Sequence, residues 1–568
     1  MGDGETWSEC HDGAGLRETG GSVKLRTVMP ALHHKIADWF HSRGWTPRPH
    51  QLAMLQQGLA GHSALLISPT GGGKTLAGFL STLHELAEPH SHEGIHTLYI
   101  SPLKALAVDI ARNLEAPVRE MDLPITIETR TGDTPQSRRA RIRTHPPDIL
   151  ITTPEQLSLL VADPAAAHLL RNLRSVIIDE LHAVVTSKRG VLLSLALTRV
   201  RAHAPATRFF GLSATVADPD AVRAWLAPAG TPPVALVTGA AGAAPDLHIL
   251  ESEERVPWSG HSSRYAVPDI YAAIKRHGMS LIFVNTRSQA ELLFRELWDV
   301  NEDTLPIALH HGSLDVAQRR KVEAAMAANS LKAVVATSTL DLGIDWGDVD
   351  LVIQVGAPKG SSRLLQRIGR ANHRLDDPSK ALLVPSNRFE VLECEAAVEA
   401  VADNAQDTEY PMVMKLDVLA QHMLGRAVAG PFASDDLFRE VTSAFTFRNL
   451  ARELFDQTLD YVATGGYALK SYERYAKLRQ QPDGLWRLSH PRLGQQYRLN
   501  IGTIVEDEMI KVRIARIRTV LGKRVATGGF VLGELEESFI AQLAYGDTYL
   551  FAGQVLRHEG LDEYGALA

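Results

Sequence analysis

Short apolar runs that recur at helix-length intervals constrain the fold of this chain more than any other feature. The first series lies within residues 31–235 and comprises Ala64–Ile67, Thr97–Ile100, Ile149–Ile151, Val176–Ile178 and Arg208–Leu212. Such short runs are typical of strands buried on both faces, and the stretches between them are long enough for crossover helices. The pattern therefore predicts a parallel sheet covered by helices, which is an α/β fold.

A second series of apolar runs predicts a second α/β domain over residues 236–394. It comprises Leu281–Val284, Pro306–Leu309, Ala333–Ala336, Leu351–Val355 and Ala381–Val384. Between the two series, near residues 227–260, the sequence becomes rich in Ala, Gly and Pro, as expected of a domain boundary. We therefore expect two tandem parallel-sheet domains.

The remaining parts of the chain have different patterns. Residues 395–482 are predicted to be mainly helical, and residues 483–568 are predicted to form a β-rich module. The strand-like runs of this module are Tyr497–Val505, Lys511–Ile517 and Thr548–Gln554. Residues 1–30 are polar and glycine-rich without periodicity, and we interpret them as a flexible tail.

Composition narrows the class of protein. No apolar run approaches the roughly 18 residues needed to cross a bilayer, and the first residues lack a signal-peptide core. We therefore expect a cytoplasmic protein without a membrane partner. The formal net charge of −7 argues against a wholly basic protein that coats nucleic acid, but it is compatible with one basic channel in an otherwise acidic molecule.

Cysteine and histidine usage argues against a structural metal. Cys10 and Cys394 are the only cysteines, so the chain cannot build a disulfide framework or a clustered-thiolate metal site. The pairs His33-His34 and His310-His311 are not part of any metal-binding spacing, and we interpret them as surface or interdomain residues. We expect no structural metal.

A glycine-rich segment follows the run Ala64–Ile67 and opens an apparent helix. It reads Ser68-Pro69-Thr70-Gly71-Gly72-Gly73-Lys74-Thr75, with serine at a position where the general pattern has glycine. The backbone N–H groups of such a loop wrap phosphate oxygens, and the helix N-terminus adds a favourable dipole. Lys74 is expected to neutralise the β- and γ-phosphates, and Thr75 to ligate Mg²⁺. The segment predicts a nucleoside triphosphate site.

Two adjacent carboxylates end the run Val176–Ile178. Asp179 and Glu180 come about a hundred residues after the phosphate loop, in a predicted parallel sheet. At the carboxyl edge of that sheet Asp179 can hold Mg²⁺ through water, and Glu180 can orient and deprotonate the attacking water. The sequence thus predicts Mg²⁺-assisted phosphoryl transfer to water.

These motifs resemble those of superfamily 2 helicases. Asp179-Glu180-Leu181-His182 with Ser213-Ala214-Thr215 resembles the DExH-box signature, and the later motifs follow in order: Phe283–Arg287, His310–Leu314, Ala336–Asp345 and Gln366–Arg370. More specific phrases resemble the large helicase-related (Lhr) group: Ser101–Ala107, Arg130–Thr134, Thr152–Glu155 and Ser187–Gly190. The runs Pro358–Leu365 and Val531–Glu537 resemble its ligase-associated DNA-damage-response branch. The resemblance implies two RecA-like domains, a winged-helix domain over the helical segment and a β-barrel-like module at the end.

The resemblance also assigns residues around the nucleotide. Gln51 would recognise adenine, because its amide offers a donor and an acceptor, so ATP is the expected nucleotide. Gln366, Arg367 and Arg370 would reach the γ-phosphate from the second domain, and we favour Arg370 over Arg374 as the arginine finger. Gly343 and Asp345 would also line the site. Asp345 either contacts the ribose or caps a helix.

A further set of residues is expected to grip nucleic acid or to couple it to hydrolysis. The grip is assigned to small hydroxyl and basic residues placed after strands, which suit a track that holds phosphates without reading bases: Lys104, Arg130, Thr131, Thr153, Thr286, Arg287, Thr337 and Ser338. His182, Ser213 and Thr215 are the expected coupling residues.

Two basic stretches remain open to more than one interpretation. Arg138–Arg143 is either a solvated helix face or an extra backbone contact. In the accessory region, basic residues alternate along a strand-like stretch, where they either guide a nucleic-acid strand or are solvated on an open sheet face: Lys511, Arg513, Arg516, Arg518, Lys523 and Arg524.

From the motifs and the resemblance we expect an ATP- and Mg²⁺-dependent DNA helicase. The residues indicate the chemistry, and the resemblance alone implies DNA as substrate, 3′-to-5′ movement on single strands with a 3′ overhang or a fork, a role in repair, and a ligase or nuclease as partner. Two alternatives remain open: a helicase for RNA or RNA:DNA hybrids, and an ATP-switched DNA clamp that does not unwind.

Overall fold

The computed structural model describes residues 32–568 apart from short gaps at 90–92, 215, 261, 342–347, 372–377, 406, 408–409, 467–468, 470–471, 473–474, 503–508, 521–522 and 563–564. The expected tail over residues 1–30 lies outside the described residues. So do Thr215, Gly343, Asp345 and Arg374. None of the described helices is long and apolar enough to span a membrane.

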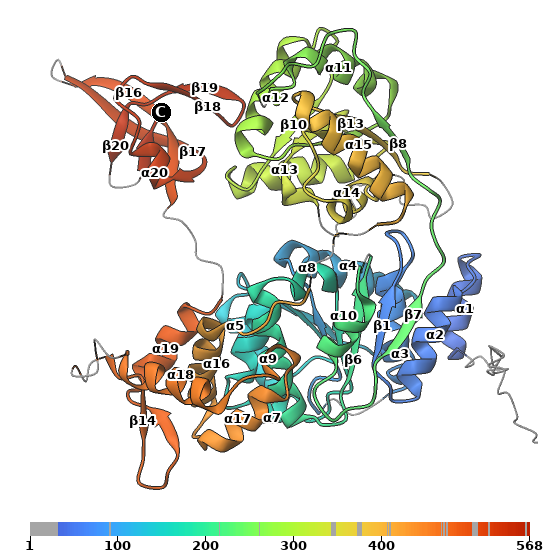
Figure 1. Ribbon diagram of the computed structural model, residues 1–568, viewed down its shortest axis with the longest axis vertical. Coiled ribbons are helices and arrows are strands. Elements are labelled where there is room, and N and C mark those ends of the chain that lie inside the picture. Colours follow the sequence, from blue (N-terminus) through green and yellow to red (C-terminus); the bar gives the residue numbers. More distant parts are fainter. Residues whose placement is uncertain are drawn as a thin grey trace, which may run out of the picture.

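The first domain is a parallel sheet covered by helices on both faces (Figure 1). Its strand order is β3-β4-β2-β5-β6-β1-β7, with β1 (Ala64–Ile67), β2 (Thr97–Ile100), β3 (Ile127–Arg130), β4 (Ile149–Thr152), β5 (Ser175–Ile178), β6 (Arg208–Ser213) and β7 (Ala235–Thr238). Its helices are α1 (His34–Ser42), α2 (Pro49–Leu59), α3 (Lys74–Glu85), α4 (Lys104–Glu120), α5 (Gln136–Thr144), α6 (Pro154–Val161), α7 (Ala166–Leu169), α8 (Leu181–Val185), α9 (Lys188–His203) and α10 (Pro219–Leu226). All five predicted strands are confirmed.

Two strands of this sheet were not predicted. The sequence of β3, Ile-Glu-Thr-Arg, carries only one apolar residue, which an edge strand tolerates. β7 lies within the Ala-, Gly- and Pro-rich stretch and pairs with β1 as the other edge strand. Because β7 completes the first sheet and β8 (Asp246–Ile249) joins the second, the chain crosses between the domains after Thr238.

The second domain repeats this architecture, so the prediction of two tandem α/β domains is confirmed. Its parallel strands follow the order β10-β11-β9-β12-β13-β8, with β9 (Ser280–Phe283), β10 (Ile307–His310), β11 (Ala333–Ala336), β12 (Leu351–Val355) and β13 (Lys380–Val384). Its helices are η1 (Arg264–Ala266), α11 (Val267–Arg276), α12 (Arg287–Asp299), α13 (Val316–Ala327), η2 (Ser338–Leu340), α14 (Ser361–Ile368) and α15 (Arg388–Ala402). α15 is one helix across residue 394.

A winged-helix domain follows, as expected. It contains α16 (Leu416–Ala429), α17 (Ser434–Thr442), η3 (Phe445–Phe447), α18 (Arg452–Thr464), the hairpin β14 (Leu478–Gln480) and β15 (Trp486–Leu488), and α19 (Arg492–Leu499). The strand expected from Tyr497 is wrong there, because Tyr497 lies in α19, buried against Gly425 of α16. Val191, Leu192 and Leu195 of α9 share one core with this domain, which therefore packs on the first domain.

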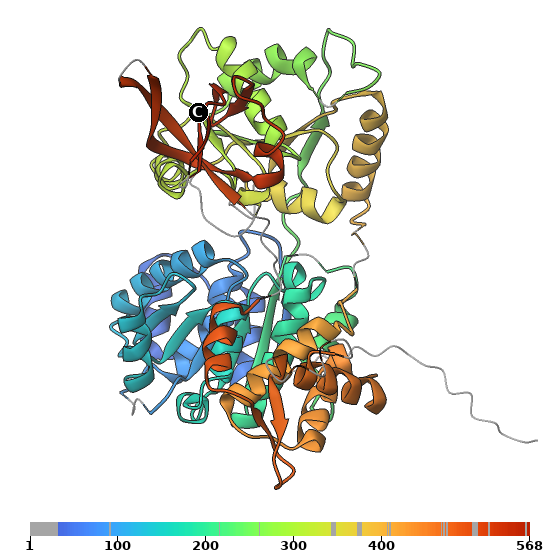
Figure 2. The same cartoon turned by 90° about the vertical axis from the view of Figure 1, so that its left-hand side faces the viewer.

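The β-rich module is built around a long two-stranded ribbon, β16 (Met509–Val520) and β17 (Lys523–Glu536). It also contains α20 (Glu537–Ile540), β18 (Thr548–Phe551), β19 (Gln554–Arg557), β20 (Gly560–Asp562) and β21 (Gly565–Leu567). The expected run Thr548–Gln554 is thus a hairpin, with its turn at Ala552-Gly553. This module lies beside the second domain, and the winged helix lies beside the first (Figure 2).

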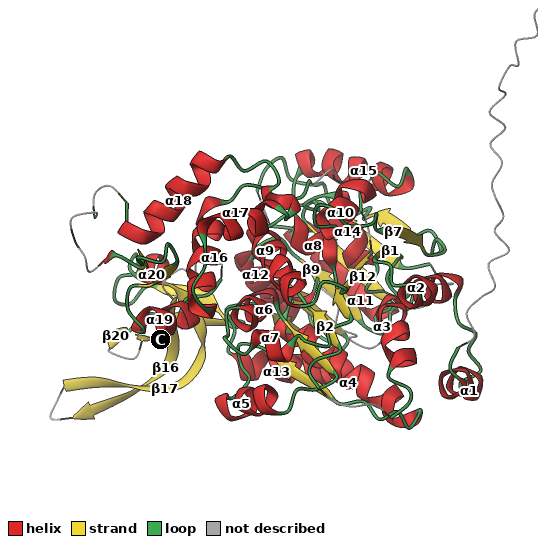
Figure 3. Ribbon diagram, turned by 90° about the horizontal axis from the view of Figure 1, so that it is seen from below, coloured by secondary structure: helices red, strands yellow, loops and turns green. Residues whose placement is uncertain are grey.

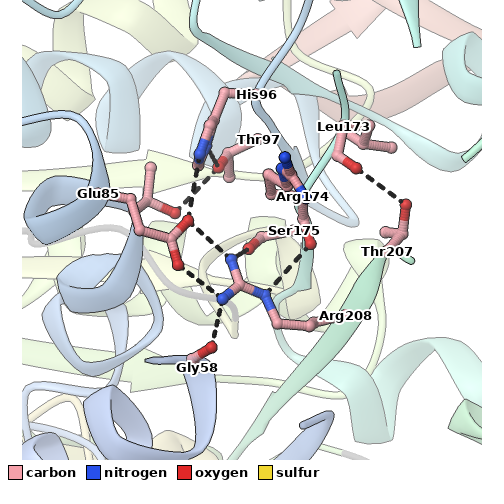
Figure 4. Close-up of polar contacts among 10 residues, drawn as sticks. Gly58, Glu85, His96, Thr97, Leu173, Arg174, Ser175, Thr207 and Arg208 are labelled. Carbon is pink, nitrogen blue, oxygen red and sulfur yellow. Dashed lines mark hydrogen bonds and ion pairs between the residues drawn. The ribbon is translucent and has the colours of Figure 1, made fainter. Parts of the chain in front are cut away.

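An ion-pair network ties the ends of α2 and α3 to the first sheet (Figure 4). Arg208, at the start of β6, makes two hydrogen bonds of 2.6 and 2.8 Å to the carboxylate of Glu85 at the end of α3. It also donates to the Gly58 carbonyl and to Ser175 Oγ. His96 Nε2 lies 3.2 Å from Glu85 Oε2. Burial raises the pKa of Glu85, but bonds from His96 and Arg208 dominate and lower it to about 2. Because α3 begins with Lys74, this network anchors the helix behind the phosphate loop.

Candidate nucleotide site and nucleic-acid track

The phosphate loop lies at the carboxyl end of β1 and leads directly into α3. Gly73 is the N-cap of α3 with a positive φ of 74°, a conformation that side chains other than glycine rarely adopt. At Gly72, a Cβ atom would stand 2.3 Å from Ser68 Oγ and 2.9 Å from the Pro69 carbonyl. The glycines are therefore required by the path of the loop, which exposes N–H groups at a helix N-terminus.

Residues at the start of α2 form hydrogen bonds with backbone carbonyls of the phosphate loop. Gln51 Nε2 donates to the Gly73 carbonyl at 3.4 Å, and Gln51 Oε1 accepts the Arg48 N–H at 2.9 Å. His50 Nε2 lies 2.8 Å from the Gly72 carbonyl, and Arg48 Nη1 donates to the Gly71 carbonyl at 3.3 Å. The structure thus brings the predicted Gln51 to the loop. The sequence analysis did not predict the contacts of His50 and Arg48 with the loop, although both residues belong to the same Arg-Pro-His-Gln motif as Gln51.

Lys74 is enclosed by its own loop. Its Nζ donates to the Ser68 carbonyl at 3.0 Å and to the Pro69 carbonyl at 3.2 Å. Burial lowers the pKa of this amine, whereas the carboxylates of Glu180 and Asp179 raise it. A cation thus lies between the loop and the two carboxylates, where β- and γ-phosphates of a bound triphosphate would lie.

Asp179 follows β5 and is held by a residue that the sequence did not single out. Tyr99 of β2 donates its hydroxyl to Asp179 Oδ2, while Asp179 Oδ1 accepts the Glu180 N–H at 2.9 Å. Tyr99 is fully buried and stacks on Phe79 of α3 with ring centroids 4.9 Å apart. The Thr75 side chain also bonds to Tyr99. Tyr99 therefore links the two residues expected to hold Mg²⁺.

These oxygens fit a magnesium ion. Mg²⁺ prefers oxygen donors and is usually held through a carboxylate, a hydroxyl, waters and substrate phosphates. Asp179 and Thr75 supply the first two donors beside the loop. Burial and the neighbouring Glu180 carboxylate raise the pKa of Asp179, an effect that a bound divalent cation would oppose.

Glu180 is placed to face the cleft. It has a positive φ of 45° as the N-cap of α8, an uncommon conformation that ends β5 sharply. Burial raises the pKa of Glu180, but the nearby cations His182, Lys74 and Arg370 outweigh burial, and the pKa is lowered overall. His182 Nδ1 lies 2.8 Å from Ser213 Oγ at the end of β6. His182 and Ser213, two of the three expected coupling residues, are therefore in contact. The third, Thr215, lies outside the described residues.

The second domain meets the phosphate loop at the end of α14. A Cβ atom on Gly369 would stand 3.0 Å from Thr70 Oγ1, so the backbone of Gly369 lies against the loop. The next residue, Arg370, is 3% exposed and acts electrostatically on both Lys74 and Glu180. Arg370 therefore reaches the nucleotide site from across the cleft, and Gln366 lies one turn earlier on the same helix.

Arg367 is oriented differently from Arg370. Its Nε donates to Asp341 Oδ1 at 2.8 Å and its Nη1 to Gln354 Oε1 at 2.6 Å, and its guanidinium lies 4.7 Å from the Phe283 ring centroid. All of these partners belong to the second domain. In this conformation Arg367 fixes α14 to its own sheet, and Arg370 extends toward the phosphate loop.

The predicted track residues all lie at the carboxyl ends of strands. Lys104 follows β2 and pairs with Asp133 at 3.0 Å, and Arg130 ends β3 beside Thr131. Thr153 and Thr286 cap α6 and α12, while Thr337 and Ser338 follow β11. Arg287 is paired with Glu536 of the β-rich module. The structure therefore places the set on one edge of each parallel sheet.

Arg130 stands out within this set. It is 8% exposed, and its Nε has no hydrogen-bond partner among the described residues. Burial and the neighbouring Arg139 lower its pKa to about 10, so the group still carries its charge at neutral pH. A buried guanidinium with spare donors suits a phosphate oxygen.

Family comparisons match three consecutive parts of the chain. Residues 48–222 match the DEAD/DEAH box helicase family, residues 265–374 the helicase conserved C-terminal domain, and residues 399–567 the winged helix domain of large helicase-related proteins. The Lhr-Core ATP-dependent helicases of Methanothermobacter thermautotrophicus and Sulfolobus acidocaldarius are each 34% identical, over 93% and 94% of this chain. The chain spans 62% of the length of each.

Solved structures agree with these matches. The Mycobacterium smegmatis helicase Lhr bound to single-stranded DNA and AMP-PNP is 34% identical, with a TM-score of 0.74 over 84% of this chain and 63% of that one. The DUF1998 helicase MrfA bound to DNA is 22% identical with a TM-score of 0.73, covering 95% of this chain and 73% of that one, and shares the fold. The chain belongs to the Lhr group of superfamily 2 helicases.

Proposed function

We propose that this chain is a nucleic-acid-dependent ATPase that moves 3′ to 5′ along single-stranded DNA and displaces the complementary strand. The position of Arg370 carries the proposal, because the backbone of Gly369 lies against the phosphate loop of the first domain and the next residue, Arg370, acts electrostatically on Lys74. A finger supplied across a cleft makes hydrolysis depend on closure, and closure is how a nucleotide cycle becomes movement.

Each residue has a chemical role in this proposal. Mg²⁺, held through Asp179 and Thr75, would supply charge neutralisation on the β- and γ-phosphates. Lys74 adds a second positive charge, Gln51 binds the adenine edge, and Glu180 orients and deprotonates the attacking water. Arg370 stabilises the charge that develops on the transferred phosphoryl group.

Coupling to nucleic acid is assigned to the strand ends next to this site. The pair His182–Ser213 connects α8, which begins directly after Glu180, to the end of β6. Arg130, with its spare donors, and the hydroxyl residues after β4 and β11 grip phosphates without reading bases. DNA as the substrate is supported by the single-stranded DNA bound to the M. smegmatis relative. Polarity rests on resemblance to the Lhr group, and a repair role and a ligase or nuclease partner rest on resemblance to its ligase-associated branch.

Steady-state ATPase activity with and without single-stranded DNA tests the motor. We expect strong stimulation in the unaltered chain and almost none for Glu180→Gln, which retains nucleotide binding. A preparation that binds ATP but shows no stimulation would overturn the proposal.

Strand displacement then tests unwinding and substrate. We expect displacement from 3′-tailed but not 5′-tailed DNA duplexes. Preference for an RNA:DNA hybrid with the same 3′ tail would identify the hybrid-directed alternative. Binding without displacement by the unaltered chain would identify an ATP-switched clamp.

A further inference from the structure

Two adjacent histidines meet a glutamate from a distant part of the chain at one end of the first domain. His33 precedes α1, His34 is the first residue of α1, and Glu88 follows the end of α3. Each of the three offers one ligand atom, and these atoms lie within 4.8 Å of one another. Among the described residues, no other group of histidine, cysteine or carboxylate side chains is arranged in this way.

The backbone at the start of α1 brings the two imidazoles together. His33, the N-cap, has a non-helical backbone with φ −53° and ψ 138°. The ring centroids of His33 and His34 are 4.3 Å apart, with the ring planes tilted by 38°. A third histidine, His84 of α3, fixes this arrangement, because its Nδ1 accepts the backbone N–H of His33 at 3.2 Å. His84 therefore positions the cluster and is not one of the three ligand residues.

A hydrogen bond between His33 and Glu88 does not account for the whole cluster. His33 Nε2 lies 3.0 Å from Glu88 Oε1, but the Glu88 side chain is 70% exposed, and ion pairs this exposed contribute little to stability. The Nδ1 atom of His33 is buried and has no hydrogen-bond partner among the described residues. The pair with Glu88 thus leaves one ring nitrogen of His33 unused, and it gives His34 no role.

The donor atoms of the cluster suit a transition-metal cation. Zn²⁺ binds imidazole nitrogen at about 2.0–2.1 Å and carboxylate oxygen at about 2.0–2.2 Å. Two such donors on one tetrahedral ion lie roughly 3.3 Å apart, which is close to the distance between His33 Nε2 and Glu88 Oε1. Mg²⁺ prefers oxygen donors alone, so this cluster differs in kind from the magnesium site beside the phosphate loop.

The cluster lies at the edge of the molecule. Figure 3 shows α1 at the outer edge of the first domain, on the side away from the winged helix and the β-rich module. Ile36, Trp39 and Phe40 bury one face of α1 in the core of the first domain. Because α3 runs from Lys74 to Glu85, the cluster and the phosphate loop lie at opposite ends of the same helix.

From this geometry we propose that His33, His34 and Glu88 form a Zn²⁺ site, with water as the fourth ligand, that ties the start of α1 to the end of α3. The polar contacts of α1 otherwise include the end of α4, where Trp39 Nε1 donates to Glu120 Oε2 at 2.7 Å. The ion adds a link to the helix that begins at the phosphate loop.

This site departs from the expectation of no structural metal that the sequence gave rise to. That expectation relied on spacing along the chain, and 55 residues separate His33 from Glu88. Only the fold brings the ligands together. The proposal is independent of the proposed motor function, because neither ATP nor nucleic acid takes part in it.

Competition with a chromophoric zinc chelator measures the affinity of the full chain, prepared without a histidine tag and freed of metal. His34→Asn and Glu88→Gln each remove one ligand, and His62→Asn removes an exposed histidine of the same domain outside the cluster. We expect the unaltered chain and His62→Asn to bind Zn²⁺ with equal affinity. In the two ligand variants the Kd should rise at least about tenfold. Equal affinity in all four proteins, or an equal loss in His62→Asn, would overturn the proposal.

X-ray absorption at the zinc edge identifies the ligands of the bound ion. We expect nitrogen and oxygen neighbours at about 2.0–2.2 Å, with the outer scattering that is typical of imidazole rings. A sulfur neighbour at about 2.3 Å would assign the ion to Cys10 or Cys394 and would contradict the proposed ligand set.

Amide hydrogen exchange tests the link between the two helices. Zn²⁺ should slow exchange in α1 and at residues 85–88 of the unaltered chain, leave α16 unchanged, and have no effect on Glu88→Gln. If Zn²⁺ binds but exchange in α1 stays the same, the ion does not tie α1 to α3 and the proposal is wrong. Thermal unfolding without Zn²⁺ identifies a variant that has lost its fold, and the other ligand variant then carries the comparison.

Discussion

Tyr99 shows how one buried hydroxyl can organise the hydrolysis site. It donates to Asp179 Oδ2 and bonds to Thr75, while its ring is stacked on Phe79. The sequence did not reveal this role, because it arises from register. Tyr99 pairs with Ile177 of β5, so its side chain meets the carboxylate that follows that strand. No spacing along the chain indicates such a cross-strand contact.

Tyr99→Phe is expected to weaken the response to Mg²⁺ while preserving the fold. The phenyl ring keeps its stacking on Phe79, but Asp179 loses a charge-assisted hydrogen bond, which is worth about 1.5–3 kcal/mol. We expect the Mg²⁺ concentration for half-maximal ATPase activity to rise about tenfold, with little change in Tm. Tyr265→Phe, which removes a buried hydroxyl bound to the Pro385 carbonyl, is the control and should leave the Mg²⁺ response unchanged.

Variants of Arg367, in α14, and of Arg370, two residues after its end, are expected to lose different functions. Arg370→Ala should lower kcat about a thousandfold or more with nearly unchanged ATP binding, as for other arginine fingers. Arg367→Ala leaves Asp341 and Gln354 without their buried partner, so it should also lower the Tm. Stopped-flow nucleotide binding, single-turnover hydrolysis and thermal unfolding separate the two outcomes. Equal loss of nucleotide binding in both variants would contradict the assigned roles.

At the scale of elements, the buried strands and the edge strand β10 could be predicted, but the edge strands β3, β7 and β8 could not. Interior strands such as β2, β4 and β5 are apolar because both faces are covered by helices. β7 and β8 lie at the edges of their sheets, in or next to a stretch that resembles a linker by composition. Tyr497 was predicted to begin a strand, yet it lies in α19, where it packs against Gly425 of α16.

The network around Arg208 is expected to stabilise the first domain in a pH-dependent way. Arg208→Met leaves the partly exposed Glu85 carboxylate with His96 as its remaining partner, and the loss of a charge-assisted hydrogen bond costs about 1.5–3 kcal/mol. Because the pKa of Glu85 is lowered in the folded state to about 2, its contribution is complete above its ordinary pKa of 4.5 and is lost as the pH falls toward 2. The free energies of unfolding in urea of the unaltered chain and of Glu85→Gln should therefore become equal as the pH falls from 4.5 toward 2. If the difference between the two free energies of unfolding stays the same over this pH range, Glu85 stabilises the domain by packing and not by its charge.

At the scale of the whole molecule, the accessory domains divide between the two motor domains. The winged helix is joined to the first by a shared apolar core and by Arg199–Glu440, with Nη1 and Oε2 2.8 Å apart. The β-rich module is joined to the second through Glu291 and Arg287. Each accessory domain should therefore move with its own motor domain.

Closure of the cleft is expected to change the distance between the winged helix and the β-rich module. Cys394 is buried, so after Cys10→Ser single dyes can be placed at exposed positions by Gln480→Cys on the winged helix and Tyr545→Cys on the module. Energy transfer in this pair should change when AMP-PNP and single-stranded DNA are added. Pairs Arg171→Cys/Gln480→Cys and Arg276→Cys/Tyr545→Cys, each within one predicted rigid unit, should stay constant. A change in energy transfer within either unit would mean that the accessory domain moves relative to its own motor domain. The prediction that each accessory domain moves with its motor domain would then be wrong.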